Sequence, residues 1–347
     1  MLTNTKNSNI TKAYKNSENG LEPHFFANSM DRRISVAPMM GCTDRHCRAL
    51  LRLISPNSLL FSEMIVTGAL IHGDAQHYLK HARDEPCALQ LGGSDPVALR
   101  QCATMVEDAG YQEINLNVGC PSDRVQYGGI GACLMAEPKL VAECLHEMQE
   151  QVNIPVTIKC RIGIDEYDSY EFFHNFVQEV AKSGCEVFYI HARSAILEGL
   201  SPKENREIPP LKYDYVYKIK NDFPHLQFFI NGGIKTTQQV VEQLSKVDGV
   251  MMGRVPYHDP YLLAEIERQI FNFQSPSRLE IVSQFIQYGQ ETLVPGEHPK
   301  HIIKHLLGLF LGCTGAKKYR RYLSDHMFDA KGSLDIVFDA LKHAELA

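Results

Sequence analysis

The sequence predicts a (β/α)₈ TIM barrel, an α/β fold, followed by a small C-terminal all-α helical domain. Short apolar, β-prone runs alternate with longer amphipathic stretches from Ile34 onward, and eight such runs can be counted. Their starts lie far enough apart for a crossover helix each time, and eight parallel strands covered on both faces close into a barrel. We therefore expect the barrel over residues 31–262 and the helical domain over residues 263–347.

The elements are expected in this order along the chain. Residues 1–30 are rich in Asn, Lys, Ser and Thr and lack a continuous apolar stretch, so they are expected to form a polar, disordered tail. The eight strands are expected at 34–39, 59–65, 87–91, 113–118, 156–161, 187–192, 227–231 and 249–253. Ser275-Pro276 predicts the start of a helix, with Ser275 as its cap. Further helices are expected at 299–311, 317–327 and 334–346.

Composition excludes several classes of protein. Hydrophobic residues make up 44% and charged residues 22%, which is typical of soluble globular chains. The longest apolar stretch, 302–313, is shorter than the roughly 20 residues of a membrane span. Ten cysteines without a C-x-x-C pair indicate reduced thiols in the cytoplasm and no metal site. Because the net charge is -6, any affinity for nucleic acid must come from a local basic patch.

Active sites of such barrels lie at the carboxyl ends of the strands, and the last two strands end in glycine turns. Asn231-Gly232-Gly233 follows the seventh strand, and Gly253-Arg254 follows the eighth. Glycines let backbone N–H groups approach an anion, and Arg254 adds a fork of donors. Either motif alone is equally typical of a tight turn, but two adjacent ones favour a phosphate site.

Cations end the fifth and sixth strands. Lys159 and Arg161 close the fifth strand, and His191 and Arg193 close the sixth. A lysine within the apolar run 156–159 is costly to bury unless an electron-rich or anionic partner awaits it, and a cofactor is the natural partner. His191 on its own is more typical of a core histidine.

Cys120 stands apart from the other cysteines because of its position. It follows the fourth strand between Gly119, which permits close approach, and Pro121, which stiffens the chain. Cys102, Cys144 and Cys185 lie on or beside expected helices and are expected to be apolar fillers. A thiol at the barrel mouth can act as nucleophile or as general acid, and the sequence leaves both roles open.

Together these motifs resemble the tRNA-dihydrouridine synthases, which are flavin-dependent barrels. The resemblance covers residues 31–325, and the segment 199–210 looks like the A subfamily, whose members act on positions 20 and 20a of the tRNA D-loop. It rests on these motifs: Pro38-Met39-Met40, Gln90-Leu91-Gly92-Gly93, Asn115 to Ser122, Lys159 to Gly163, His191-Ala192-Arg193, Asn231-Gly232-Gly233 and Gly253-Arg254. The chain departs from the pattern at Gly41-Cys42 and in the loop 126–131.

The resemblance implies a set of roles. FMN would pack against Pro38, Met39 and Met40. Gln90, Lys159 and His191 would surround its isoalloxazine ring, and the two glycine turns would hold its phosphate. NADPH would reduce the flavin, hydride would pass to C6 of uracil, and Cys120 would protonate C5. Asn117, Lys159 and Arg161 are placed to supply donors to the uracil edge.

Two alternative functions remain open at this point. A dihydropyrimidine or dihydroorotate dehydrogenase-like flavoprotein would use the same barrel, flavin and cysteine on a free pyrimidine, but it needs no basic helical domain. A noncatalytic RNA-binding barrel would not need both glycine turns, Lys159 and Cys120 intact.

A tRNA substrate predicts local basic groups. Residues 298–324 contain no Asp or Glu and carry Lys300, Lys304, Lys317, Lys318, Arg320 and Arg321. Read alone, this block is equally typical of a solvated helix face. Lys203 and Arg206, in the loop after the sixth strand, would form a clamp on tRNA phosphates together with Lys317, Lys318, Arg320 and Arg321. Arg193 at the mouth is also expected to contact the tRNA. Tyr319 and Tyr322 could stack on bases, although packing is the commoner use. No stable protein partner is expected, and the protein is expected to be a monomer.

Overall fold

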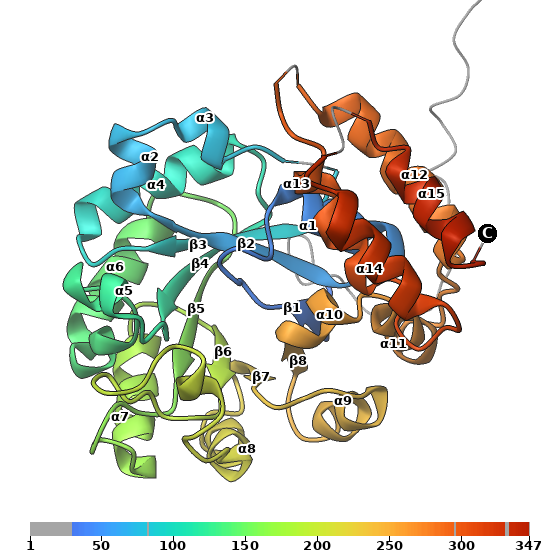
Figure 1. Cartoon of the computed structure of the whole chain (residues 1–347). Helices are drawn as coiled ribbons and strands as arrows, with labels where there is room; N and C mark the ends of the chain where they lie inside the picture. Colours follow the sequence, from blue (N-terminus) through green and yellow to red (C-terminus); the bar gives the residue numbers. More distant parts are fainter. Residues whose placement is uncertain (1–29, 82, 295, 330–332, 347) are drawn as a thin grey trace, which may run out of the picture. The chain divides into compact units, whose positions relative to one another are not determined.

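The chain forms a closed barrel of eight parallel strands, numbered in sequence order around the barrel (Figure 1). This computed structural model describes residues 30–346 except 82, 295 and 330–332; the tail expected over 1–30 therefore lies almost wholly outside the described residues. The strands are β1 (Ile34–Val36), β2 (Leu59–Val66), β3 (Cys87–Gly92), β4 (Glu113–Val118), β5 (Val156–Arg161), β6 (Val187–His191), β7 (Gln227–Asn231) and β8 (Gly249–Met252). The predicted TIM barrel is confirmed.

Seven of the eight strands begin and end within one residue of the predicted bounds, and β1 is the exception. The sequence predicts a strand to residue 39, but β1 ends at Val36. Pro38 has no N–H to extend the ladder, and Cys42 N and Thr43 N both donate to Met39 O at 3.0 Å. The chain therefore turns at Met39 instead of continuing the strand.

Helices surround the barrel and follow it. Those up to β8 are α1 (Arg45–Ile54), α2 (Thr67–His72), α3 (Ala75–Tyr78), α4 (Pro96–Asp108), α5 (Asp123–Tyr127), η1 (Gly131–Ala136), α6 (Pro138–Gln149), α7 (Tyr170–Ala181), η2 (Glu204–Arg206), α8 (Tyr213–Asp222) and α9 (Thr237–Leu244). After β8 come α10 (Arg254–His258), α11 (Leu262–Ile270), α12 (Arg278–Thr292), α13 (Lys300–Ile303), η3 (Lys304–Gly308), α14 (Ala316–His326) and α15 (Ile336–His343). Because α11 packs against α9 and α1, it occupies the place of a barrel helix.

The prediction of Ser275 as a helix cap is wrong. Ser277 caps α12 instead: its side chain accepts from Glu280 N, and the Glu280 carboxylate accepts from Ser277 N, which makes a capping box. Ser275 is buried and donates to Ile54 O at 2.7 Å, so its hydroxyl ties the chain to the end of α1.

The predicted helix over 299–311 is shorter and tighter than expected. It consists of α13 followed by the 3₁₀ helix η3. At Gly308 a Cβ atom would lie 2.2 Å from His258 O, so the chain passes too close to α10 for any other residue. This close approach fixes the end of the helical run.

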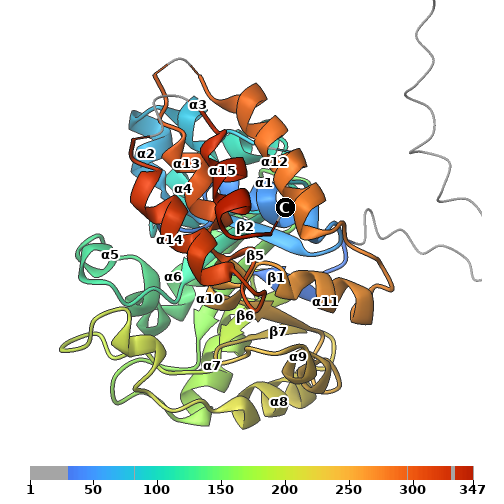
Figure 2. The same ribbon diagram turned by 45° about the vertical axis from the view of Figure 1, so that its right-hand side comes forward.

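Ion pairs attach the C-terminal helices to α1, which contacts α12, α13 and η3. Figure 2 shows α12 beside α1. Asp44 caps α1, and its carboxylate also lies 2.7 Å from Lys304 Nζ and 2.9 Å from His305 Nε2. Burial alone would raise the pKa of Asp44, but His305 and Lys304 bring it well below its usual range. The carboxylate thus caps a barrel helix and binds η3 at the same time.

Aromatic rings fill the middle of the barrel. Tyr189 on β6 stacks on Phe229 on β7 with ring centroids 4.9 Å apart, and Phe61 on β2 meets Tyr189 edge to face at 5.0 Å. All three side chains are buried, so the barrel is a packed core. Among the described residues, no helix is both long and apolar enough to cross a membrane.

Candidate active site

Hydrogen bonds from several directions hold the Cys120 turn at the end of β4. Asn117 Oδ1 accepts from Gly119 N at 3.1 Å and from Cys120 N at 3.0 Å. Arg161 Nε donates to Gly119 O at 2.9 Å, and Ala132 N donates to Cys120 O at 2.9 Å. The thiol is half-buried, and Cys120 lines the large cavity at the barrel mouth. Such a turn places one sulfur in a fixed position beside open space.

A chain of polar side chains lies beneath this turn. Asn117 Nδ2 donates to Gln90 Oε1 at 2.7 Å, and Gln90 Nε2 donates to Asn115 Oδ1 at 2.8 Å. Asn115 Nδ2 then donates to Thr157 Oγ1 at 2.9 Å, and Thr157 Oγ1 lies 2.8 Å from Glu113 Oε1. The strand register brings Gln90, Asn115 and Thr157 side by side. Sequence reasoning missed Glu113 and Thr157 and gave Asn115 no role, although polar residues alternate along 113–117 in a buried strand.

Five cationic side chains gather around the barrel mouth: Lys159, Arg161, Arg193, Arg206 and Arg254. Burial and at least one other cation of this group lower the pKa of Lys159, Arg161, Arg193 and Arg206. Burial and the neighbouring Arg161 lower the pKa of Lys159 to about 8. In the described part of the chain, the Lys159 ammonium has no hydrogen-bond partner. Burial and mutual repulsion make it unfavourable to hold these positive charges together. Their presence at one site therefore favours an anionic or electron-rich ligand.

Arg161 is already bonded to the loops that surround it. Besides Gly119 O, it donates through Nη1 to Ser194 O at 3.0 Å and to Asn205 O at 3.1 Å. It is buried, and burial lowers its pKa to about 10. Arg193 likewise donates to Pro209 O. Both side chains therefore brace the loop after β6, and only their remaining N–H groups are left for a ligand.

His191 is buried at the end of β6, and its Nδ1 atom has no hydrogen-bond partner among the described residues. Burial, together with Arg161 and Lys159 nearby, holds the pKa of His191 well below its usual value. The ring is therefore neutral at physiological pH. Its unpartnered nitrogen argues against a satisfied core histidine and leaves a polar atom for a ligand.

The two glycine turns differ in what makes glycine necessary. Gly232 and Gly233 have φ values of 112° and 73°, and a Cβ on Gly233 would lie 2.5 Å from Leu211. Around Gly253 there is open space, because its Cβ would meet only the Met39 sulfur at 3.9 Å. Asn231 donates to Met251 O at 2.7 Å and so ties β7 to β8.

Arg254 has a carboxylate partner in this structure. Its Nη1 lies 2.8 Å from Glu207 Oε1, and both side chains are largely exposed. An exposed pair of this kind contributes little to stability, so a phosphate can compete with Glu207 for the guanidinium.

The residues at the mouth fit a phosphate-bearing flavin. The open space at Gly253, after β8, leaves room for an anion next to Arg254. Among the described residues, the buried Nδ1 atom of His191, at the end of β6, has no hydrogen-bond partner. The half-buried Lys159 ammonium on β5 forms no hydrogen bond or ion pair with them. Unpaired buried polar groups are costly, so a ligand with acceptors and donors would satisfy them.

A cavity of about 1210 Å³ opens beside Cys120. The residues that line it come from β2 and the ends of β3 and β4, from α1, α2, α3 and α5, from the loops beside them, and from the start of α13 with the segment before it. Met40, which is 66% exposed, and Glu63 lie on its wall, as do Glu297 and His301. Gly41, where the chain departs from the family pattern, has φ 75° and donates its N–H to Glu63. The cavity is large enough for more than one nucleotide.

The predicted RNA-contacting residues fall into two exposed groups. Lys203 and Arg206 are exposed in the loop after β6. On α14, Lys317, Lys318, Arg320 and Arg321 are exposed, whereas Tyr319 is fully buried and packs on Phe310. Tyr319 therefore belongs to the core rather than to a stacking surface. Lys304 is paired with Asp44, so it serves to attach η3.

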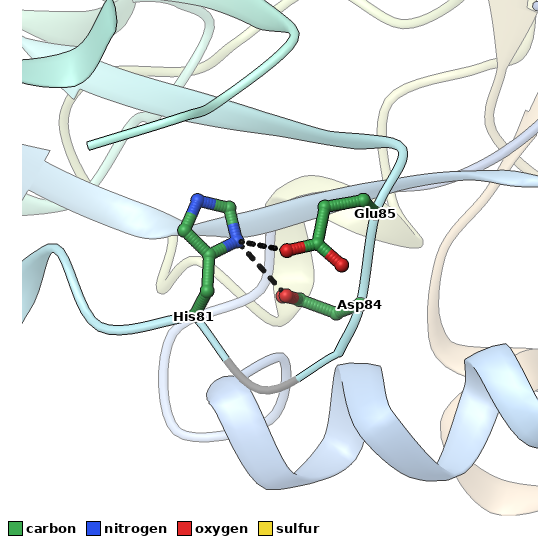
Figure 3. A group of neighbouring side chains, drawn as sticks. All are labelled: His81, Asp84 and Glu85. Carbon is green, nitrogen blue, oxygen red and sulfur yellow. Dashed lines mark hydrogen bonds and ion pairs between the residues drawn. The ribbon is translucent and has the colours of Figure 1, made fainter. Parts of the chain in front are cut away.

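One cluster of potential metal ligands lies in the loop before β3. His81 Nδ1 is 3.0 Å from Asp84 Oδ1 and 3.6 Å from Glu85 Oε1 (Figure 3). Arg48 pairs with the buried Asp84 carboxylate, and the His81 ring packs on Tyr111. These contacts account for the cluster as an ion-pair network that holds the loop against α1.

Comparison with known proteins decides the family. The model of the family "Dihydrouridine synthase (Dus)" matches residues 35–345. The chain belongs to the dihydrouridine synthase family. The resemblance stated from the motifs is thereby confirmed, and members of this family are flavin-dependent oxidoreductases.

Relatives within the family are similar over most of their length. The chain is 52% identical to the tRNA-dihydrouridine(20/20a) synthase of Escherichia coli K12, covering 89% of this chain and 91% of that protein. It is 51% identical to the protein of the same name from Pasteurella multocida, covering 92% and 97%. A solved 2-naphthoyl-CoA reductase complex shares the fold with a TM-score of 0.54, 12% identity, and coverage of 67% of this chain and 49% of that chain.

Proposed function

We propose that this dihydrouridine synthase reduces uridine to 5,6-dihydrouridine in the D-loop of tRNA, at positions 20 and 20a, with FMN as cofactor and NADPH as electron donor. What carries the proposal is that the Cys120 thiol lines a nucleotide-sized cavity, in a chain 52% identical to tRNA-dihydrouridine(20/20a) synthases. The group of cations around the barrel mouth supports it, because both the flavin phosphate and tRNA are anionic.

The flavin would be held by residues at the ends of most strands. Pro38, Met39 and Met40 would contact its ring system, and Gln90, Lys159 and His191 would bond to the ring. Its phosphate would lie at the turns of Asn231, Gly232, Gly233, Gly253 and Arg254. When bound, FMN supplies the hydride that NADPH delivers and that uracil C6 receives.

The residues of the chain would orient the base and supply the proton. Asn117 and Lys159 have N–H hydrogens that make no hydrogen bond within the described chain, and so does Nη2 of Arg161. Each of these groups can therefore donate to a uracil oxygen. The Cys120 S–H would protonate C5 as hydride arrives at C6, and the thiolate would regain a proton from solvent. One hydride and one proton thus add across the C5–C6 double bond.

The tRNA would be held outside the barrel by two basic groups. Arg193, Lys203 and Arg206 lie in or beside the loop after β6, and Lys317, Arg320 and Arg321 lie on α14. Phosphate contacts at both groups would fix the D-loop while one base leaves its stack and enters the cavity.

Comparing substrates tests this proposal. The FMN-loaded protein should oxidise NADPH with uridine-containing tRNA transcript and form dihydrouridine in it, and it should turn over free uracil or orotate far more slowly. A preference for the free pyrimidine would instead establish the dehydrogenase-like alternative. Binding of tRNA with no flavin binding and no turnover would establish a noncatalytic RNA-binding barrel.

We infer that the protein works in the cytoplasm as a monomer. All ten cysteines lie in the described part of the chain and are free thiols, which supports a reducing compartment. Sedimentation of the purified protein with and without tRNA would test the monomer, since a dimer would sediment at twice the expected mass.

A further inference from the structure

The row of hydrogen-bonded polar side chains inside the barrel, from Asn117 to Glu113, donates in the same direction at every step. At its lower end, Thr157 Oγ1 faces two acceptors, the Glu113 carboxylate at 2.8 Å and Ile114 O at 3.2 Å. The single hydroxyl hydrogen must therefore go to one of them. Whichever one accepts it, Thr157 presents a lone pair to Asn115 and can only accept from Asn115 Nδ2.

The direction of the hydrogen bond between Asn115 and Thr157 determines the direction of each following hydrogen bond, through Gln90 to Asn117. Because Nδ2 of Asn115 donates to Thr157, its Oδ1 faces Gln90. Gln90 must therefore donate through Nε2 to Asn115, which leaves its Oε1 facing Asn117. Asn117 then donates through Nδ2 and presents Oδ1 to the N–H groups of Gly119 and Cys120. The upper end demands the same direction, because backbone N–H groups can only donate. Both ends thus select one orientation for three amides whose nitrogen and oxygen are nearly the same size.

We propose that Asn115, through the Thr157–Glu113 pair beneath it, is a positioning residue that fixes the orientation of Gln90 and Asn117 and thereby of the Cys120 turn. Arg32 anchors the lower end by donating through Nε to Glu113 Oε2 at 2.7 Å. Gln90 and Asn117 are each left with one N–H hydrogen outside the chain, which suits acceptor oxygens on the flavin and on uracil. That last step rests on the proposed function, whereas the orientation of the turn does not.

The variant Asn115→Asp tests the direction of the chain because it changes hydrogen bonding and not size. When ionised, the new carboxylate has no N–H for Thr157, so it and Glu113 compete for one hydroxyl hydrogen. When protonated, the new carboxyl group reproduces Asn115, since its carbonyl accepts from Gln90 and its O–H donates to Thr157. The other ionisable groups around Glu113 and Asn115 are Arg32, Cys185, Tyr189 on β6 and Lys159, which pairs with Asn117 on β4.

We expect the FMN affinity of Asn115→Asp to match that of the parent at pH 5 and to be about tenfold weaker or more at pH 9, the equivalent of one lost buried hydrogen bond. Iodoacetamide should alkylate Cys120 several-fold faster than in the parent at pH 9 and equally fast at pH 5, as measured by mass spectrometry of its peptide. Gln243→Glu provides the matched control, because this buried amide bonds to Tyr217 on the outside of the barrel. Its effects should show no such dependence on pH.

The double variant Glu113→Gln with Asn115→Asp gives the decisive comparison. It keeps the same net charge as the parent. The new amide at position 113 can donate to Thr157, which then donates to the new carboxylate at position 115. We expect FMN affinity and Cys120 alkylation at pH 9 to return toward the parent values. If the double variant is no better than Asn115→Asp alone, or if Asn115→Asp follows the parent at every pH, the proposal is wrong.

Cys120 alkylation and urea unfolding allow the proposal to be tested even if the protein binds no FMN or the variant unfolds. If the parent bound no FMN, the proposed function would fail, but the alkylation series would still test the chain. If Asn115→Asp unfolded at pH 9, urea unfolding across the pH range would replace FMN affinity. The same recovery of stability in the double variant is then expected, and its absence would overturn the proposal.

Discussion

The side-chain oxygen of Asn117 accepts a hydrogen bond of 3.0 Å from the backbone N–H of Cys120, three residues further along the chain. This bond makes the end of β4 and the Cys120 turn one rigid piece. The rigid strand β4 therefore fixes the position of the thiol. A proton donor to a bound base requires such a fixed position.

Replacing Cys120 with Ala should separate the two half-reactions. Reduction of bound flavin by NADPH is expected to be unchanged, because it does not use the thiol, while dihydrouridine formation should fall roughly 10² to 10⁴-fold, the usual contribution of a general acid. Stopped-flow absorbance and nucleoside analysis measure the two steps. Cys133→Ala is the matched control, since Cys133 is a half-buried thiol in the neighbouring helix η1. Near-normal dihydrouridine formation by Cys120→Ala would remove the thiol from the mechanism.

Two glycines near the Cys120 turn should respond differently to Ala. Both Gly129 and Gly131 have positive φ, at 63° and 82°. Only at Gly131 would the added Cβ clash, at 2.5 Å from Cys120 O and from Val125. Gly129→Ala should cost about 1 kcal/mol of stability and spare activity, whereas Gly131→Ala should cost more and lower kcat. Equal effects in urea unfolding and turnover would show that the turn tolerates displacement.

Arg254→Ala should weaken FMN binding by about 10 to 100-fold, because a charge-assisted bond to phosphate is worth about 1.5–3 kcal/mol. The barrel should stay folded, since the side chain is exposed. Flavin fluorescence after dialysis measures the loss. Glu207→Gln is the control: it frees Arg254 from its carboxylate partner and should leave FMN binding equal or tighter. Full retention of flavin by Arg254→Ala would refute the phosphate assignment.

Acidification should weaken the attachment of α12 to α1 through His46. His46 Nδ1 lies 2.7 Å from the Tyr288 hydroxyl, and burial lowers the pKa of His46 to about 4. Below pH 6.5, His46 binds a proton in the unfolded chain but stays neutral in the folded protein. The free energy of unfolding should therefore fall as the pH drops from about 6.5 to 4, by at most about 1.4 kcal/mol per pH unit.

Urea unfolding at several pH values measures this effect as the difference between the parent and His46→Gln. The difference isolates His46 from the carboxylates that titrate in the same range. A difference that does not change between pH 6.5 and 4 would show that His46 is not the responsible group.

Arg320→Ala with Arg321→Ala should weaken tRNA binding at low salt, by a factor that shrinks as salt is added. Removing two phosphate contacts should lower the slope of log affinity against log salt by about two. Filter binding or anisotropy measures it, and Lys139→Ala with Lys235→Ala provides exposed control positions on other parts of the barrel. NADPH oxidation by the flavin alone should not change. Unchanged affinity would remove α14 from the proposed clamp.

The apolar runs of the strands were enough to predict the barrel, because parallel strands buried on both faces leave a strong local pattern. The end of β1 and the cap of α12 were harder to place. Pro38 ends the first strand earlier than the apolar run indicates. At α12 the Ser277–Glu280 pair was the better signal and was present in the sequence.

The candidate site was predictable where residue type and strand end coincide, as at Cys120, Lys159 and His191. The sequence could not show that the Arg161 donors are taken by the carbonyls of Gly119, Ser194 and Asn205, since those loops meet only in the folded chain. Nor could it pair Asn115 with Gln90, because that contact depends on the register of β3 against β4.

The central claim is that this protein makes dihydrouridine at positions 20 and 20a of tRNA, and mapping that nucleoside in cells without the protein tests it most directly. In tRNA from a deletion strain, dihydrouridine should be missing at those two positions and present at the other D-loop positions. The parent gene should restore it, and a gene carrying Cys120→Ala should not. Unchanged dihydrouridine at positions 20 and 20a in the deletion strain would contradict the account.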